Sequence, residues 1–124
     1  MYINMYRKHY FHDDCLLEGY RHKCSPIIDD HHLINKAKLP KGSSARYYCE
    51  YVHPEIFIVP ICRLHNSVSK LADTKVGRKL IVMRLNEIFG IGYVKEVING
   101  LQDEFKVPKP ELTFKAIMSI PLPE

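Results

Sequence analysis

Apolar and polar residues are arranged differently in the two halves of this chain, and the change lies near Cys62. Before it, short apolar runs are broken by Gly and Pro, which predicts strands and loops. After it, apolar residues recur every three or four positions, which predicts helices. The chain therefore reads as a small α+β protein in the order loop, strand, loop, strand and then helices.

Two strands are expected in the first half. Apolar residues at 27–28 and 33–34 flank the polar run DDHH, which predicts a strand with a polar centre. The run 55–61, EIFIVPI, is rich in β-branched and aromatic residues and predicts a second strand. Pro60 near its end predicts that this strand lies at a sheet edge or stops there. Between the strands, residues 35–46 predict a flexible basic loop.

Helical spacing dominates after Cys62. It predicts a short helix over 63–72, a longer one over 73–90 and a third over 94–105, while the last run, LTFKAIMSI, fits a strand and a helix equally. Asp73 or Thr74 is the expected N-cap of the longer helix, which a glycine ends. Its expected apolar stripe is Ile81, Leu85 and Ile88.

Size and composition set limits on function. With 124 residues, 46% of them hydrophobic, residues 1–124 suit a single domain with one core, which excludes a multidomain enzyme and a disordered chain. No run of about 18 apolar residues exists to span a membrane. The N-terminus also lacks the apolar stretch of a secretory signal, so we expect a cytoplasmic, intracellular protein.

Cysteine and histidine crowd into the first 65 residues. In an intracellular chain, four cysteines are better read as metal ligands than as disulfides. Cys62 and His65 lie three apart at the start of a helix, a spacing that suits half of a zinc site, and Cys15 with Cys24 can complete a tetrahedron. The alternative is that these cysteines only pack in the core, as we expect for Cys49. Other candidate ligands are Cys49, His12 and His22.

A second group of polar residues does not fit zinc alone. Asp30, His31 and His32 stand in the middle of an apolar strand, and Asn66 directly follows a candidate zinc ligand. A neutral imidazole is the usual general base near pH 7. A hard divalent ion such as Mg²⁺ or Mn²⁺ binds oxygen ligands, including an Asn carbonyl. Together they suggest a single-metal phosphodiester hydrolase; the alternative is two ordinary histidines at a strand end.

The order of these motifs resembles an HNH endonuclease of the zinc-containing ββα-metal (His-Me finger) type that is frequent in phages and mobile elements. The resemblance covers about Cys15 to Leu71 and rests on the two early cysteines, DDHHLI and IVPICRLHN. It implies a zinc-stapled ββα-metal core over 12–72 and a helical extension over 73–124. The implied structural zinc ligands are Cys15, Cys24, Cys62 and His65.

The resemblance also implies roles in catalysis. His32, followed by two apolar residues, matches the general base, while His31 and Asn66 match the ligands of a catalytic Mg²⁺ or Mn²⁺. The register is open by one residue, with Asp30 as the ligand and His31 as the base in the other reading. Three departures are clear: the first cysteine pair is wider than Cys-x-x-Cys, Asn35 replaces a common proline, and Phe57 stands near the place of the central Asn.

The implied activity is hydrolysis of nucleic-acid phosphodiester bonds, with DNA favoured as the partner. The net charge of +4 permits such a partner, and between Arg63 and Arg84 only Asp73 is acidic. The expected phosphate contacts, which could equally be a solvated helix face, are Lys36, Lys38, Lys41, Arg63, Lys70, Arg78 and Lys79.

Two other functions stay open. One is a catalytically inactive, zinc-stapled module that binds nucleic acid or protein, which the changed central Asn favours. The other is a small viral protein that binds a host factor through its tyrosine-rich N-terminus and C-terminal helices. Those helices either only cover the core or form a homodimer.

Overall fold

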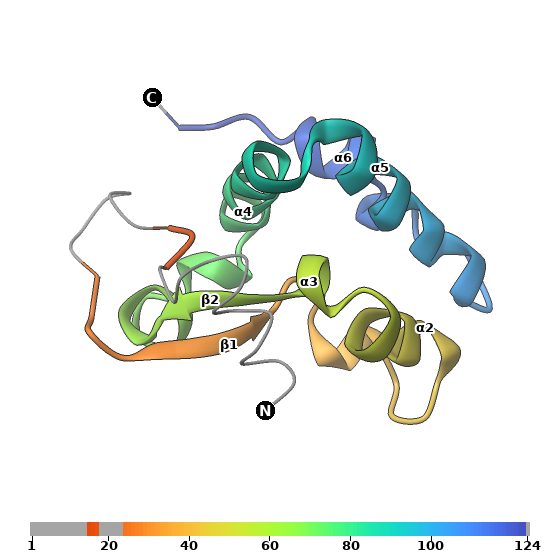
Figure 1. Cartoon of the computed structure of the whole chain (residues 1–124), viewed down its shortest axis with the longest axis horizontal. Helices are drawn as coiled ribbons and strands as arrows, with labels where there is room; N and C mark the ends of the chain where they lie inside the picture. The colour runs from red at the N-terminus through yellow and green to blue at the C-terminus, as the bar shows by residue number, and fades with distance from the viewer. Residues whose placement is uncertain (1–14, 18–23, 124) are drawn as a thin grey trace.

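The computed structural model describes residues 15–17 and 24–123 (Figure 1). A two-stranded antiparallel sheet is followed by helices, so the α+β class is confirmed. The other candidate ligands His12 and His22 lie outside the described residues. The elements are β1 Ile28–His32, η2 Lys36–Lys38, α2 Ser44–Tyr47, η3 Tyr48–Val52, α3 Pro54–Phe57, β2 Ile58–Cys62, η4 Leu64–Val68, η5 Leu71–Asp73, α4 Lys75–Phe89, α5 Ile91–Gly100, η6 Leu101–Glu104, η7 Pro110–Leu112 and α6 Phe114–Met118.

Strand β1 forms where the polar run was expected, and it pairs with β2 so that His32 lies opposite Ile58. The pairing continues one residue further, because the Leu33 N–H donates to the Phe57 carbonyl at 2.8 Å. The other side of β2 receives the segment 15–17, since the Leu16 N–H donates to the Pro60 carbonyl at 3.0 Å. The carbonyl of Pro60 is therefore hydrogen-bonded, although proline has no N–H to donate within the strand.

The prediction that the second strand begins at Glu55 was wrong. Residues 54–57 form the helical turn α3, because Pro54 at its first position has a φ already suited to a helix. Glu55 is only 7% exposed, and its carboxylate accepts hydrogen bonds from the Tyr93 hydroxyl at 2.6 Å and His53 Nδ1 at 3.1 Å. This buried carboxylate therefore links α3 to α5.

The long helix α4 begins and ends where its local signals predict. The Thr74 side chain accepts a hydrogen bond from the Gly77 N–H at 2.9 Å, and Gly90, with φ of 92°, ends the helix. The expected apolar stripe is partly wrong: Ile81 and Leu85 are buried, but Ile88 is 42% exposed. Of the described helices, none has both the length and the apolar character needed to cross a bilayer.

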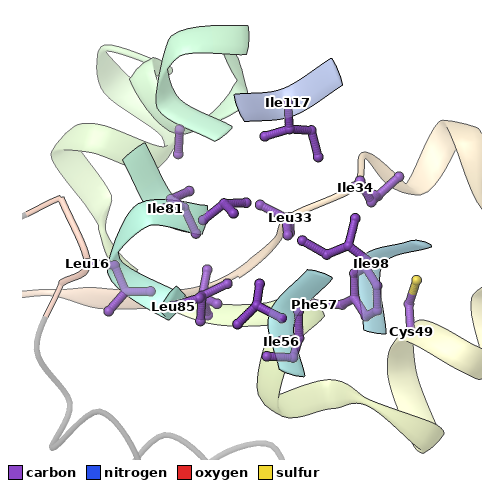
Figure 2. Close-up of a cluster of buried hydrophobic side chains, with 14 of the residues drawn as sticks. Leu16, Leu33, Ile34, Cys49, Ile56, Phe57, Ile81, Leu85, Ile98 and Ile117 are labelled. Atoms are coloured by element: carbon purple, nitrogen blue, oxygen red, sulfur yellow. The ribbon is translucent and has the colours of Figure 1, made fainter. Parts of the chain in front are cut away.

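One apolar core joins the sheet to the C-terminal helices (Figure 2). Leu33 directly follows β1 and Phe57 directly precedes β2, while Ile81, Ile98 and Ile117 come from α4, α5 and α6. In Figure 1 these three helices lie together on one side of the sheet. The segment 64–68 lies at one end of β2, and α2 lies beyond the other end. The extension thus covers the core that supports the sheet.

Candidate functional site

Four candidate zinc ligands converge beside the sheet. The ligand atoms of Cys15, Cys24, Cys62 and His65 all lie within 4.8 Å of one another. His65 Nδ1 lies 3.1 Å from the Sγ of Cys62, 3.6 Å from that of Cys24 and 3.8 Å from that of Cys15. Zn–S bonds of about 2.3 Å and a Zn–N bond of about 2.1 Å place tetrahedral ligands at similar separations.

Local structure explains why this Cys₃His cluster forms. Cys62 ends β2, and the turn η4 that follows returns His65 to the same side. The Leu16 N–H donates to the carbonyl of Pro60, which lies two residues before Cys62 in β2. This hydrogen bond places Cys15 next to β2. Cys24 comes from the segment that leads into β1. The wide spacing of the first cysteine pair is therefore compatible with one shared site.

The chemistry of the cluster suits a divalent cation. Burial raises the pKa of the Cys15 thiol, and burial together with the two neighbouring thiols raises the pKa of Cys24 to about 12. Burial also acts on Cys62, but N–H groups of His65 and Ser25 lower the pKa of its thiol below the ordinary value. Three neighbouring thiolates repel one another, and a zinc ion removes that cost. The cluster is compatible with a structural Zn²⁺.

Cys49 lies outside this cluster. It is fully buried among apolar residues on η3, and burial raises the pKa of its thiol to about 12. A neutral thiol in such surroundings behaves as a small apolar side chain, as we expected.

A second polar site borders the first. His31 is 5% exposed, and its Nδ1 lies 2.9 Å from Asn66 Oδ1. Asn66 directly follows the candidate zinc ligand His65, so the turn η4 that completes the Cys₃His cluster also presents the amide to β1. Burial lowers the pKa of His31, against smaller opposing effects of Asn66 and the Ala72 backbone, so its imidazole is neutral at pH 7.

These groups border a cavity of about 240 Å³. It is lined by Asp30, His31, His32, Asn35, Asn66 and Asp73. Asp73 belongs to η5, and the sequence suggested it only as a helix cap. Its position as the single acid in a basic run was the one sequence feature that could have indicated a place in this cavity. Asn35 lines the same cavity and was noted only as a departure from the family pattern.

His32 lies on the other face of β1 from His31, as alternation along a strand requires. Its Nε2 is 3.5 Å from Glu50 Oε1 on η3, and Glu50 also accepts a hydrogen bond from Arg46 Nε at 3.2 Å. His32 therefore borders the cavity without facing Asn66 directly. Sequence reasoning missed Glu50, because its approach depends on how η3 packs.

The expected phosphate contacts are in different surroundings. Arg63 forms a two-point ion pair with Asp29, with Nη2 to Oδ1 at 3.0 Å, and Lys79 Nζ donates to the Ile120 carbonyl at 2.6 Å. Arg78 is half-buried, and burial lowers the pKa of its guanidinium. Lys70 is exposed, and the side chain of Lys36 lies outside the description.

The remaining two predicted contacts, Lys38 and Lys41, line a separate cleft of about 610 Å³. Lys38 is also 3.9 Å from Glu111.

Comparison with protein-family models, curated proteins and solved structures finds no match to the chain. The arguments about function therefore rest on these contacts and their chemistry.

Proposed function

We propose that the chain is a metal-dependent nuclease of the HNH type, with a zinc-stapled ββα-metal core. One observation carries the proposal: His31 Nδ1 and Asn66 Oδ1 approach to 2.9 Å at the border of an open polar cavity. Adjacent ligands of an octahedral Mg²⁺ with bonds of about 2.1 Å lie about 3.0 Å apart, which is close to the distance between these two atoms. The pair would hold an exchangeable Mg²⁺ or Mn²⁺.

The surroundings of the pair support this reading. Burial lowers the pKa of His31, which favours the neutral imidazole, and the tautomer with the proton on Nε2 would offer the lone pair of Nδ1 to a metal. Asp30 and Asp73 border the cavity and add negative charge that favours a cation. The ion would stabilise charge on a phosphate and its leaving oxygen. The Cys₃His cluster would fix η4, and therefore Asn66, relative to β1.

His32 is the proposed general base. It borders the cavity, and the carboxylate of Glu50 lies 3.5 Å from its Nε2, a contact that can orient the imidazole. The base would remove a proton from water that attacks phosphorus. Phe57 supplies no amide where the family has its central Asn; here the Leu33 N–H bond to the Phe57 carbonyl holds the end of β1.

Cleavage of supercoiled plasmid, single-stranded DNA and RNA with Mg²⁺ or Mn²⁺ tests the proposal. Loss of the base is expected to reduce the rate 10²- to 10⁴-fold in His32→Ala. Asn66→Ala should lower the rate and raise the metal concentration needed, while the matched control Asn86→Ala, outside the cavity, should cut like the wild type. Zinc content should stay unchanged in all three variants.

The same assay decides the register and the second candidate function. If His32→Ala still cuts while Asp30→Asn does not, Asp30 is the ligand and His31 the base. Replacement of the central Asn by buried Phe57 favours the second candidate, an inactive zinc-stapled binding module. Wild-type protein that binds DNA but never cuts it with any divalent ion would establish that module and overturn the nuclease.

A further inference from the structure

Four lysines line the cleft of about 610 Å³, which lies between the segment 37–45 and the segment 104–109. Lys38 and Lys41 come from the first segment, and Lys106 and Lys109 from the second. Glu104 is the one acidic side chain among the residues that line it. Concave surfaces of one charge concentrate ligands of the opposite charge, so this cleft suits a polyanion.

The two walls of the cleft are built to stay together. The Ser44 hydroxyl donates to the Glu104 carbonyl at 3.1 Å, which joins the walls directly. The Lys109 N–H donates to Gln102 Oε1 at 2.8 Å and fixes the second wall against η6. Lys109 Nζ also lies 5.6 Å from the centre of the Phe105 ring, which positions its charge at the cleft.

The cleft adjoins the proposed cleavage cavity. Asn35 lines the cavity and Ala37 lines the cleft, and the Ala37 N–H donates to Asn35 Oδ1 at 2.8 Å. The segment 35–37 therefore contributes a residue to each of the two sites.

We propose that this cleft binds the phosphate backbone of the nucleic-acid substrate next to the cleavage site, with Lys106 and Lys109 as contacts from the C-terminal extension. The inference rests on the proposed function, because it takes the nuclease substrate as the ligand. It gives the extension a role in binding in addition to covering the core. Contacts of this kind carry affinity and position, and they read no sequence.

The test is the salt dependence of binding to a fluorescent DNA duplex, measured by anisotropy without added divalent ion. Each phosphate contact contributes about 0.9 to the slope of log K against log salt, so Lys106→Gln/Lys109→Gln should lower the slope by about 1.8. The matched control Lys95→Gln/Lys115→Gln removes two exposed lysines outside the cleft and should leave the slope unchanged. Lys106→Arg/Lys109→Arg should keep the wild-type slope.

An unchanged slope in the Gln variant would overturn the proposal that the cleft binds phosphates. If the wild type still cuts DNA in that case, the proposed nuclease activity stands. A reduced slope in a protein that never cuts supports the cleft and overturns the nuclease. A wild type that neither binds nor cuts overturns both. Polyglutamate competing as well as DNA at equal charge would overturn the assignment to a nucleic-acid backbone.

Discussion

The region around the sheet and the region of helices α4–α6 share one core but place polar groups very differently. Among the described residues, the buried titratable side chains outside the cysteines are His31, Glu55 and His65, and all three lie before α4. The buried side chains of α4 and α5 are aliphatic, apart from Gly77. The first region therefore holds the buried polar groups and the Cys₃His cluster that is compatible with zinc, and the second consists of apolar burial.

This difference teaches where chemistry can reside. Buried histidine and carboxylate groups cost free energy unless partners or ions satisfy them, so their presence points to binding or structural staples. Apolar burial in the C-terminal helices stabilises the fold and can offset the free energy that the buried polar groups cost. The predictions below separate the two regions, beginning with the largest effect.

Removal of one zinc ligand should affect the first region most. Cys62→Ser should lose the metal and about 10 kcal/mol of folding free energy, so the sheet region should not fold. Elemental analysis should give about one zinc per wild-type chain and none in the variant. Cys49→Ala should retain its zinc, because that thiol lies in the apolar core. Equal zinc in Cys62→Ser and wild type would contradict the ligand set.

Truncation in the second region should cost stability without loss of metal. Leu85 is fully buried on α4, so Leu85→Ala should lower the free energy of unfolding by about 2–5 kcal/mol in urea titrations. Zinc content should stay at the wild-type value. Met83→Ala, at a position 37% exposed on the same helix, should cost much less. Equal losses in the two variants would contradict the placement of α4.

Gly77 lies where the two regions meet. An added Cβ would overlap the Leu71 carbonyl, so Gly77→Ala should shift η5 and cost about 1–3 kcal/mol. Gly92 on α5 has open space around its Cα, and Gly92→Ala should instead stabilise by up to about 1 kcal/mol. Thermal melts of both variants measure the contrast. Stabilisation of both would show that α4 does not press on η5.

The smallest expected effect comes from the buried carboxylate that joins the regions. Tyr93→Phe removes the hydroxyl that donates to Glu55 and should cost about 1 kcal/mol in urea unfolding. Tyr47→Phe changes a tyrosine that is 62% exposed and should cost almost nothing. Equal free energies of unfolding for the two variants in urea would show that the Tyr93–Glu55 hydrogen bond does not stabilise the contact between α3 and α5.

The sequence predicts those features that depend on neighbouring residues. The polar run of β1, the Thr74 cap and the glycine after α4 act within one turn or strand, so their placement follows from local chemistry. Because Cys62 and His65 are only three residues apart, their half of the cluster could be predicted from the sequence.

Features that depend on distant contacts were not predictable. Residues 55–57 have strand-like composition, but Tyr93 from α5 satisfies Glu55 in a helical turn. Asp73 reaches the cavity only because η5 packs beside η4, and Glu50 approaches His32 only through the position of η3. The cationic cleft likewise joins segments about sixty residues apart in sequence.

Calorimetric titration of zinc-loaded protein with Mn²⁺ tests the central claim most directly, because it asks whether His31 and Asn66 bind an exchangeable ion. We predict one Mn²⁺ site in addition to zinc, with affinity reduced about 10- to 100-fold or more in Asn66→Ala and unchanged in the control Asn86→Ala. Absence of Mn²⁺ binding, or equal binding by the wild type and Asn66→Ala, would contradict the account.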